Sequence, residues 1–257
     1  MNFINRTGET QLNNFGSIMI IEQYRGSADV DVYFPEYNWT AYNIQYGQFK
    51  RGTVKCPYER RTYKIGYVGE GIYNISENGK NTRVYDTWVR MLERCYEPSY
   101  QVKYPTYRGC KVCDDWHNFQ NFAEWYELNY YEVPGQTMNL DKDILYKGNK
   151  IYSPGTCVFV PQCINKIFTK SDSNRGSLPI GVYYSERDKR YIAQCSVRCN
   201  ADEKRKHLGY FHTPEEAFLA YKQFKEAYIN KVANDFIEYI PFNLYQTMIN
   251  YEVEIED

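Results

Sequence analysis

The chain has 257 residues, 43% of them hydrophobic, and a formal net charge of −1 at pH 7. This length suits one large domain or two to three small ones, and the apolar fraction suffices for a packed core. The balanced charge excludes a chain that is basic throughout, so a nucleic-acid-binding surface would have to be local. The polar first residues predict no signal peptide, and no apolar run reaches membrane-spanning length. We therefore expect a cytoplasmic protein with no membrane partner.

The first 80 residues have the pattern of a β-rich module. Three runs of β-forming residues, 17–24, 30–34 and 62–71, are separated by Gly, Asn and Pro. No group of catalytic side chains stands out in this part of the chain. The sequence therefore predicts short strands here and leaves the role of the module open.

Residues 82–95 place apolar side chains at helical spacing along one face. The members of this stripe are Tyr85, Trp88, Met91, Leu92 and Cys95. After a loop that contains Pro98 and Pro105, a short strand leads into a second amphipathic helix. Its expected buried side chains are Phe119, Phe122, Trp125 and Tyr126. We interpret both stripes as core rather than as cofactor sites, and Pro134 with Gly135 should end the second helix.

The stretch NLDKDILYKGNKIYSPGTCVFVPQCIN, residues 139–165, has the pattern of a hairpin that leads into a helix. An acidic side chain, Asp141, stands near its start, and an amide, Asn165, stands at its end. Carboxylate and amide oxygens suit Mg²⁺, which polarises a phosphate and stabilises a leaving oxygen. The sequence therefore predicts an oxygen-rich metal site that is centred on Asp141 and includes Asn165.

Phosphodiester cleavage also needs a base that activates water, and histidine is the usual choice. The residue after Asp141 is Lys142, and a lysine stays protonated at pH 7 unless burial lowers its pKa. We therefore assign Lys142 the role of a positive charge against phosphate or a leaving group. Asp143 and His117 are alternative bases, and His117 is expected at the surface near a helix start. The competing interpretation is a hairpin kept for its shape, with Asp141 and Lys142 ion-paired.

Beyond a polar linker over 170–178, three short strands are expected at about 180–184, 190–198 and 206–211. The segment 170–206 carries nine positive and five negative side chains, about +4. Arg and Lys bind backbone phosphates, and an amide side chain can read a base edge. The predicted surface for double-stranded DNA comprises Arg187, Lys189, Arg190, Gln194, Arg198, Lys204, Arg205 and Lys206. The alternative is a hairpin whose charges are simply solvated.

A helix follows the third strand, and its start is well marked. Thr213 is the expected cap, Pro214 the first helical residue, and Glu216 the partner that completes a capping box. Its apolar face comprises Ala217, Phe218, Ala220, Tyr221, Phe224 and Tyr228. A last short helix is expected within 241–251. We expect residues 175–236 to fold as an autonomous unit.

Eight cysteines raise the alternative of a zinc site. Cys110 and Cys113 have the spacing of a zinc-binding pair, and Cys95, Cys157 and Cys163 lie in the same part of the chain. Cys157 and Cys163 are six positions apart, so they do not form a second pair of that kind. Because buried free cysteine is common, the sequence disfavours zinc.

Three segments resemble the phage-borne HNH endonucleases, and in particular the branch whose motif opens with Leu-Asp-Arg or Leu-Asp-Lys. They are the helix that holds Trp88, the stretch YRGCKVCDDWHNFQNFAEW and the stretch LDKDILYKGNKIYSPGTCVFVPQCIN. The resemblance implies a ββα-metal unit in which Asp141 and Asn165 bind Mg²⁺ and Asp141 and Lys142 are catalytic. Two positions depart from the pattern, because Lys142 replaces the histidine base and Thr156 replaces the asparagine that holds the loop. Whether the chain cleaves DNA therefore stays an open question.

The stretches RGSLPIGVYYSERDKRYIAQC and HLGYFHTPEEAFLAYKQFKE resemble the APETALA-type, ethylene-response-factor-like, DNA-binding domain. In the plant domains, arginines on the first strand read bases, whereas this chain has Tyr183, Tyr184 and Ser185 there. The resemblance therefore implies DNA binding with a modest sequence preference. Together the two resemblances cover roughly residues 82–236.

These inferences define an α+β architecture. A β-rich module covers 1–80, an HNH-like ββα unit covers 81–170, and an APETALA-type unit with a C-terminal helix covers 171–257. The implied function is that of a phage or prophage protein that binds double-stranded DNA in the bacterial host cytoplasm and, if its site is active, nicks DNA slowly with Mg²⁺. The alternative is a non-enzymatic counter-defence protein on a repurposed nuclease scaffold, whose N-terminal module binds a host or phage protein.

Overall fold

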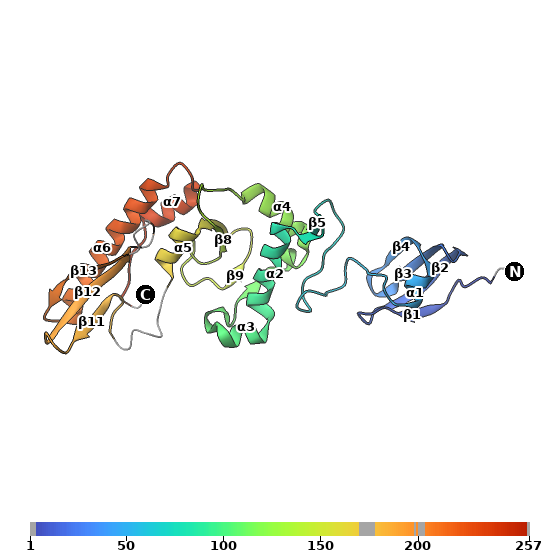
Figure 1. The fold of residues 1–257 in the computed structure, drawn as a ribbon, viewed down its shortest axis with the longest axis horizontal. Coiled ribbons are helices and arrows are strands. Elements are labelled where there is room, and N and C mark those ends of the chain that lie inside the picture. The colour runs from blue at the N-terminus through green and yellow to red at the C-terminus, as the bar shows by residue number, and fades with distance from the viewer. Residues whose placement is uncertain (1–3, 170–177, 198, 200–203, 256–257) are drawn as a thin grey trace. The chain divides into compact units, whose positions relative to one another are not determined.

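The computed structural model describes residues 4–169, 178–197, 199 and 204–255, the side chain of Lys204 excepted. Helices and several small sheets follow one another along the chain, so the α+β class is confirmed at this coarse level (Figure 1). Among the described residues, no helix is both long and apolar enough to cross a lipid bilayer.

The first of two compact units comprises residues 1–128 and 151–153. Its elements are β1 (Thr10–Leu12), β2 (Ile18–Gly26), β3 (Asp29–Phe34), β4 (Trp39–Ile44), α1 (Tyr46–Lys50), β5 (Ser76–Glu77), β6 (Lys80–Asn81), α2 (Arg83–Tyr96), α3 (Pro98–Lys103), β7 (Lys111–Val112), α4 (Phe119–Asn129) and β9 (Ile151–Tyr152). Short 3-10 turns occupy 35–37, 105–107 and 114–117. Strand β9 belongs to this unit because it pairs in parallel with β7.

Strands β1 to β4 form an antiparallel meander in chain order. Side chains of β2 and β3 on one face build a small core with Phe49 of α1. The expected strands 17–24 and 30–34 are confirmed as β2 and β3. Strand β4, which sequence reasoning missed, forms one edge of the sheet.

The expected strand over 62–71 is wrong. Tyr63 and Lys64 take left-handed backbone conformations, with φ of 51° and 60°, which interrupts an extended run. A turn results, and the Gly66 N–H donates to the Thr62 carbonyl at 2.9 Å to close it.

Helix α2 confirms the apolar stripe predicted for it. The Thr82 hydroxyl accepts a hydrogen bond from the Tyr85 N–H at 3.3 Å and so caps the helix. The indole Nε1 of Trp88 donates to the Trp116 carbonyl at 2.7 Å, which satisfies the polar atom of a buried ring. Tyr85 is half-buried, and the stripe's buried members are Trp88, Met91, Leu92 and Cys95.

Two neighbouring elements differ from the sequence prediction. Pro98 opens helix α3 where a loop was expected, and the side chain of Glu97 caps that helix. Helix α4 ends at Asn129, before the expected stop at Pro134 and Gly135. The predicted burial in α4 is confirmed for Phe119, Phe122 and Tyr126.

The second unit comprises residues 129–150 and 154–257. Its elements are β8 (Met138–Asp141), β10 (Val158–Pro161), α5 (Gln162–Phe168), β11 (Val182–Ser185), β12 (Arg190–Val197), β13 (Lys204–Phe211), α6 (Pro214–Asp235) and α7 (Phe242–Ile249). Strands β8 and β10 pair antiparallel, with Asp141 opposite Val158, and α5 packs on both strands. This is the hairpin-plus-helix arrangement that the sequence predicts for residues 139–165.

Strands β11, β12 and β13 form an antiparallel sheet, and α6 packs on one of its faces (Figure 1). The predicted capping box is present, since the Thr213 hydroxyl accepts from the Glu216 N–H at 3.2 Å and the Glu216 carboxylate accepts from the Thr213 N–H at 3.3 Å. The predicted α7 is present as well. Most of the expected linker, residues 170–177, lies outside the described residues.

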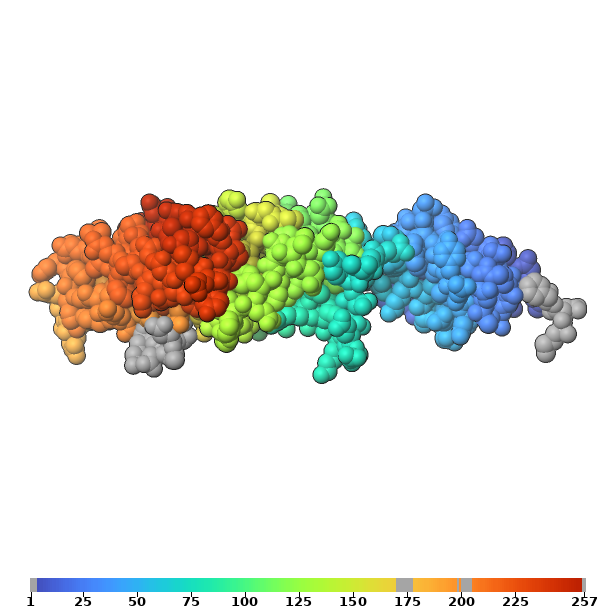
Figure 2. Space-filling model, turned by 90° about the horizontal axis from the view of Figure 1, so that it is seen from above, coloured from blue at the N-terminus to red at the C-terminus, as the bar shows by residue number. Residues whose placement is uncertain are grey.

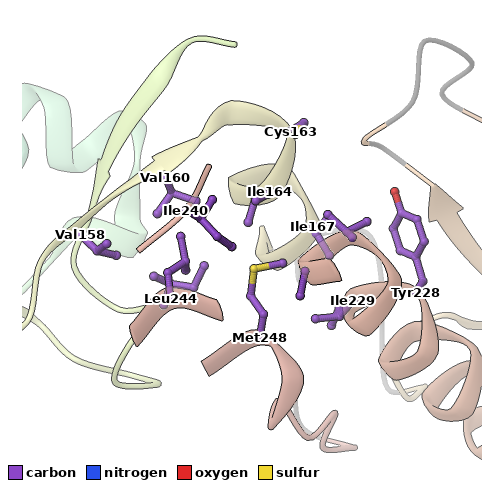
Figure 3. Packing of buried hydrophobic residues seen from close by; sticks show 13 residues of the cluster. Val158, Val160, Cys163, Ile164, Ile167, Tyr228, Ile229, Ile240, Leu244 and Met248 are labelled. Carbon is purple, nitrogen blue, oxygen red and sulfur yellow. The ribbon is translucent and has the colours of Figure 1, made fainter. Parts of the chain in front are cut away.

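One core joins the hairpin to the C-terminal helices. Its buried residues come from β10, α5, α6 and α7 and from the hairpin loop. Figure 3 shows Leu244 and Met248 of α7 directed toward Val160 and Ile164. In the space-filling view, the red C-terminal residues adjoin the yellow residues of the hairpin segment (Figure 2). The end of α6 therefore shares this core with the hairpin and α7, whereas β11, β12 and the start of α6 pack in a second cluster that also includes Val253. The expectation that residues 175–236 are autonomous stays a prediction.

Candidate functional site

Asp141 is the last residue of β8, and its carboxylate organises the turn that follows. Its Oδ1 accepts hydrogen bonds from the N–H groups of Asp143 at 2.9 Å and Ile144 at 2.8 Å. Ile144 in turn belongs to the buried core of the unit. Asp141 thus has a structural task, because it satisfies two backbone donors where the strand ends.

Lys142 is only 6% exposed, which the sequence did not predict. Its Nζ donates to Oδ2 of Asp143 at 2.9 Å, which forms an ion pair with that carboxylate. The ion pair with Asp141, which the competing interpretation expects, stays a prediction. The Lys142 carbonyl accepts a hydrogen bond from Asn149 Nδ2 at 2.6 Å. The ammonium group is therefore engaged within its own loop, and binding a phosphate there would require this ion pair to open.

Burial raises the pKa of Asp141 to about 6, and the nearby Asp143 carboxylate adds to the rise. The two backbone N–H donors act in the opposite direction. A carboxyl group with a raised pKa carries a proton more readily in the folded chain than in the unfolded chain.

Asp141→Asn is therefore expected to remove the loss of unfolding free energy that ionisation of Asp141 causes as the pH rises. In the wild type, Asp141 contributes stability that is full below about pH 4 and is lost as the pH rises through about 6. Between pH 5 and 8 the wild type should lose roughly 1 kcal/mol of unfolding free energy relative to Asp141→Asn, measured by urea denaturation. The exposed control Glu238→Gln should show no such difference from the wild type. Parallel pH profiles for wild type and Asp141→Asn would contradict the raised pKa.

Asn165, the second predicted metal ligand, is half-buried on α5. Within the described parts of the chain, no three His, Cys, Asp or Glu side chains gather where they could hold a metal ion. Mg²⁺ sites commonly use one or two carboxylates together with waters and substrate phosphates. One carboxylate already engaged in a turn and one neutral amide do not fit a metal site that the protein holds by itself.

His117 was expected at the surface, and this is wrong. It is 9% exposed, and burial lowers the pKa of its imidazole. Its Nε2 lies 3.4 Å from the Tyr96 hydroxyl, and its Nδ1 lies 3.7 Å from Asp114. His117 belongs to the first unit and Asp141 to the second. The contacts with Tyr96 and Asp114 accompany the burial of His117, and its part as an alternative base stays a prediction.

The cysteines carry free thiols, and most of them are buried. Cys110 is buried and Cys113 is partly exposed, and burial raises the pKa of the Cys113 thiol. A raised pKa disfavours the thiolate form that binds zinc. The expectation that this pair holds no zinc stays a prediction.

The loop between β11 and β12 and the first residue of β12 present three of the cations on which DNA binding was predicted. Arg187, Lys189 and Arg190 are all exposed. Arg187 pairs with Asp188 at 3.1 Å, and Lys189 pairs with Glu186 at 2.9 Å. Exposed pairs of this kind contribute little stability, so either cation can exchange its partner for a phosphate at small cost.

The face of the C-terminal sheet that turns away from α6 carries aromatic and cationic side chains. Val182, Ala193 and Cys195 pack toward α6, so the alternating positions form the outer face. Tyr183 and Tyr210 flank Ile192 in register across the three strands. Other members of this outer face are Ser185, Arg190, Gln194, Ser196, Arg205 and His207.

The remaining predicted DNA contacts separate into three groups. Gln194 and Arg205 lie on the outer face, and Arg205 is exposed. Lys206 lies on the opposite face, where its Nζ sits 4.7 Å from the centre of the Phe224 ring of α6. Arg198 and the side chain of Lys204 lie outside the described residues.

Sequence reasoning missed Tyr210 and His207, whose rings lie 4.8 Å apart on the outer face. Strict alternation along residues 204–211 would have placed them on opposite faces. A β-bulge opposite Ala193 and Gln194 inserts one residue and brings both rings to the same side. Only the strand pairing could have revealed this.

Comparison of the chain with models of protein families, with curated proteins and with solved structures gave no match. Functional inference therefore depends on the chemistry of these residues.

Proposed function

We propose that this protein binds duplex DNA through the outer face of the β11–β12–β13 sheet and the loop over 186–189. The observation that carries the proposal is the outer face itself, where Arg190 and Arg205 alternate with aromatic rings and the amide of Gln194. Arginines bind phosphates, and an amide or a tyrosine can contact a base edge from a sheet.

The resemblance of this segment to the APETALA-type domain supports the proposal, because the plant domains read DNA bases from their first strand. Tyr183 and Ser185 take positions on the outer face where the resemblance would place arginines. Without arginines there, bidentate contacts with guanine are lost from the first strand. We propose a modest sequence preference and a phage or prophage protein that acts in the bacterial cytoplasm.

We further propose that the hairpin of residues 139–165 supports the fold and does not cleave DNA at an appreciable rate. This hairpin resembles the HNH endonucleases, and the observations against cleavage are the engaged carboxylate of Asp141 and the ion pair between the buried Lys142 and the exposed Asp143. The histidine that the resemblance expects as the base is absent, and the residue in its place, Lys142, is paired with Asp143.

Incubation with supercoiled plasmid and Mg²⁺ or Mn²⁺ tests both parts of the proposal. Wild-type protein should retard the plasmid in a gel without producing nicked circles, because binding requires only the sheet. Lys142→His introduces a group that is partly neutral at pH 7 and can act as a base. Nicking by this variant that is lost in the double variant, which combines Asp141→Ala with Lys142→His, would reveal a latent metal site. Robust, Asp141-dependent nicking by wild type would overturn the proposal and make Lys142 part of a working site.

A second candidate function is that of a non-enzymatic protein whose N-terminal module binds another protein. It is favoured by the edge strand β4, along which a cavity of about 790 Å³ is lined by residues that include Trp39 and Tyr42. An unpaired strand edge can accept a strand from a partner. Failure of wild type to retard plasmid at low salt would favour this candidate over DNA binding.

A further inference from the structure

A cavity of about 320 Å³ lies within the second unit, beside the sheet where β11 begins. Strand β12 extends past β11 there, and the cavity is bounded by the last turn of α5, by the chain that enters β11, and by α6. Its size is at the lower end of the range typical of small-ligand pockets.

The polar lining of this cavity is cationic. Lys166 of α5, Arg205 of β13 and Lys225 of α6 all line it. None of its lining residues in the described parts of the chain is acidic. An anion in the cavity would meet positive charges from three separate elements, which is a favourable electrostatic environment for it.

The walls of the cavity are well supported. Lys225 donates from Nζ to the Ile167 carbonyl at 2.7 Å, which fixes its ammonium group at the end of α5. Gly181 has φ of +76°, and a Cβ there would overlap the ring of Tyr221. A glycine at this position is required by both the backbone conformation and the close contact. Specific contacts therefore set two parts of the cavity wall, those at Lys225 and at Gly181.

We propose that this cavity binds the phosphate group of a nucleotide unit. Arg205 supplies a guanidinium fork, which matches phosphate oxygens in pairs, and the lysines supply point charges. Gln194 and Ser196 line the same space and offer hydrogen-bond donors. The ring of Tyr183, which is 39% exposed, also lines it and can contact the attached sugar or base.

A phosphate of this kind has two sources, a DNA strand and a free nucleotide. The DNA source rests on the proposed function, whereas the phosphate chemistry itself does not. The cavity would extend the DNA-binding surface of the sheet past the end of β11 in the first case. It would be a separate small-molecule site in the second case.

Titration of the isotope-labelled full-length protein with inorganic phosphate, at ionic strength held constant with chloride, tests the phosphate site by NMR. Phosphate should shift the amide signals of Gly181 and Gln194, and chloride should not. Arg205→Gln and Lys166→Gln should each weaken phosphate binding about tenfold, since each removes a charged hydrogen-bond donor. The control Lys231→Gln, on an exposed part of α6, should bind phosphate like wild type.

Two further titrations identify the source. If the site takes a DNA phosphate, a short duplex displaces inorganic phosphate, and Arg205→Gln weakens both ligands. If it takes a free nucleotide, deoxyadenosine monophosphate displaces phosphate while the duplex does not. Phosphate binding without any duplex binding would reject the proposed function and leave the phosphate site standing. Absence of phosphate-specific shifts around the cavity, or equal affinity in wild type, Arg205→Gln and Lys166→Gln, would overturn the inference.

Discussion

Replacing Arg187 and Arg190 by glutamine and Lys189 by asparagine is expected to weaken duplex binding strongly and to reduce its salt dependence. If each side chain neutralises one phosphate, the slope of log K against log salt should fall by up to about three units. Asparagine is chosen at 189 because Lys189 has φ of 52°, a conformation that asparagine tolerates well. Fluorescence anisotropy with a labelled duplex over a range of KCl concentrations measures both quantities.

The expected loss is large because the loop also holds two acids. Glu186 and Asp188 pair with Lys189 and Arg187 in the free protein. Removal of the three cations leaves these two carboxylates without cationic partners, so repulsion from the DNA adds to the lost attraction. The effect should therefore be greatest at low salt, where charges are least screened.

A matched variant removes three exposed cations from the first unit, with Lys80, Arg90 and Lys111 changed to glutamine. It lowers the net charge of the chain by the same amount as the loop variant. If it weakens binding as much as the loop variant does, the effect belongs to net charge and the loop has no special part. Unchanged affinity and slope in the loop variant would remove the loop from the interface altogether.

Leu244→Ala is expected to destabilise the second unit by about 2–5 kcal/mol, the usual range for a buried leucine. Leu244 is fully buried in the core that α7 shares with α5 and β10 (Figure 3). Because this core contains residues of both the hairpin and the C-terminal helices, the loss should appear as one cooperative transition. Urea denaturation followed by far-ultraviolet circular dichroism, with amide signals of β10 and α6 as local probes, provides the measurement.

Phe242→Ala provides the control, since Phe242 lies in the same helix but is 74% exposed. Its effect should stay within about 0.5 kcal/mol. If Leu244→Ala shifted the unfolding of α6 and left β10 unchanged, the hairpin and the helices would be separate cooperative units. The hairpin and the helices would then touch in the native state but would not unfold together.

Features that depend on neighbours along the chain could be predicted from the sequence. The start of α6 was predicted because Thr213, Pro214 and Glu216 act on one another within a single helical turn. The buried stripe of α2 was predicted because helical periodicity alone determines which side chains share a face. The same local reasoning placed Asn165 on the helix that follows the hairpin.

Features that depend on distant contacts could not be predicted in this way. His117 is buried through its packing against Tyr96, which lies 21 positions earlier in the chain. Lys142 is buried in a loop that also contributes Ile144 to the core, and sequence spacing does not show this packing. The ammonium group of Lys142, which was predicted to bind phosphate, is instead paired with Asp143.

The left-handed conformation of Lys189 means that the residue best for stability at this position differs from the residue that supplies a positive charge. A lysine in this region costs roughly 1 kcal/mol relative to glycine, and asparagine also adopts it more readily. Selection for thermal stability alone would therefore favour glycine or asparagine at position 189. Either change would remove a positive charge from the loop between β11 and β12. Variants selected for thermal stability should therefore carry glycine or asparagine at position 189. Variants selected for tight binding to a polyanion should keep lysine there.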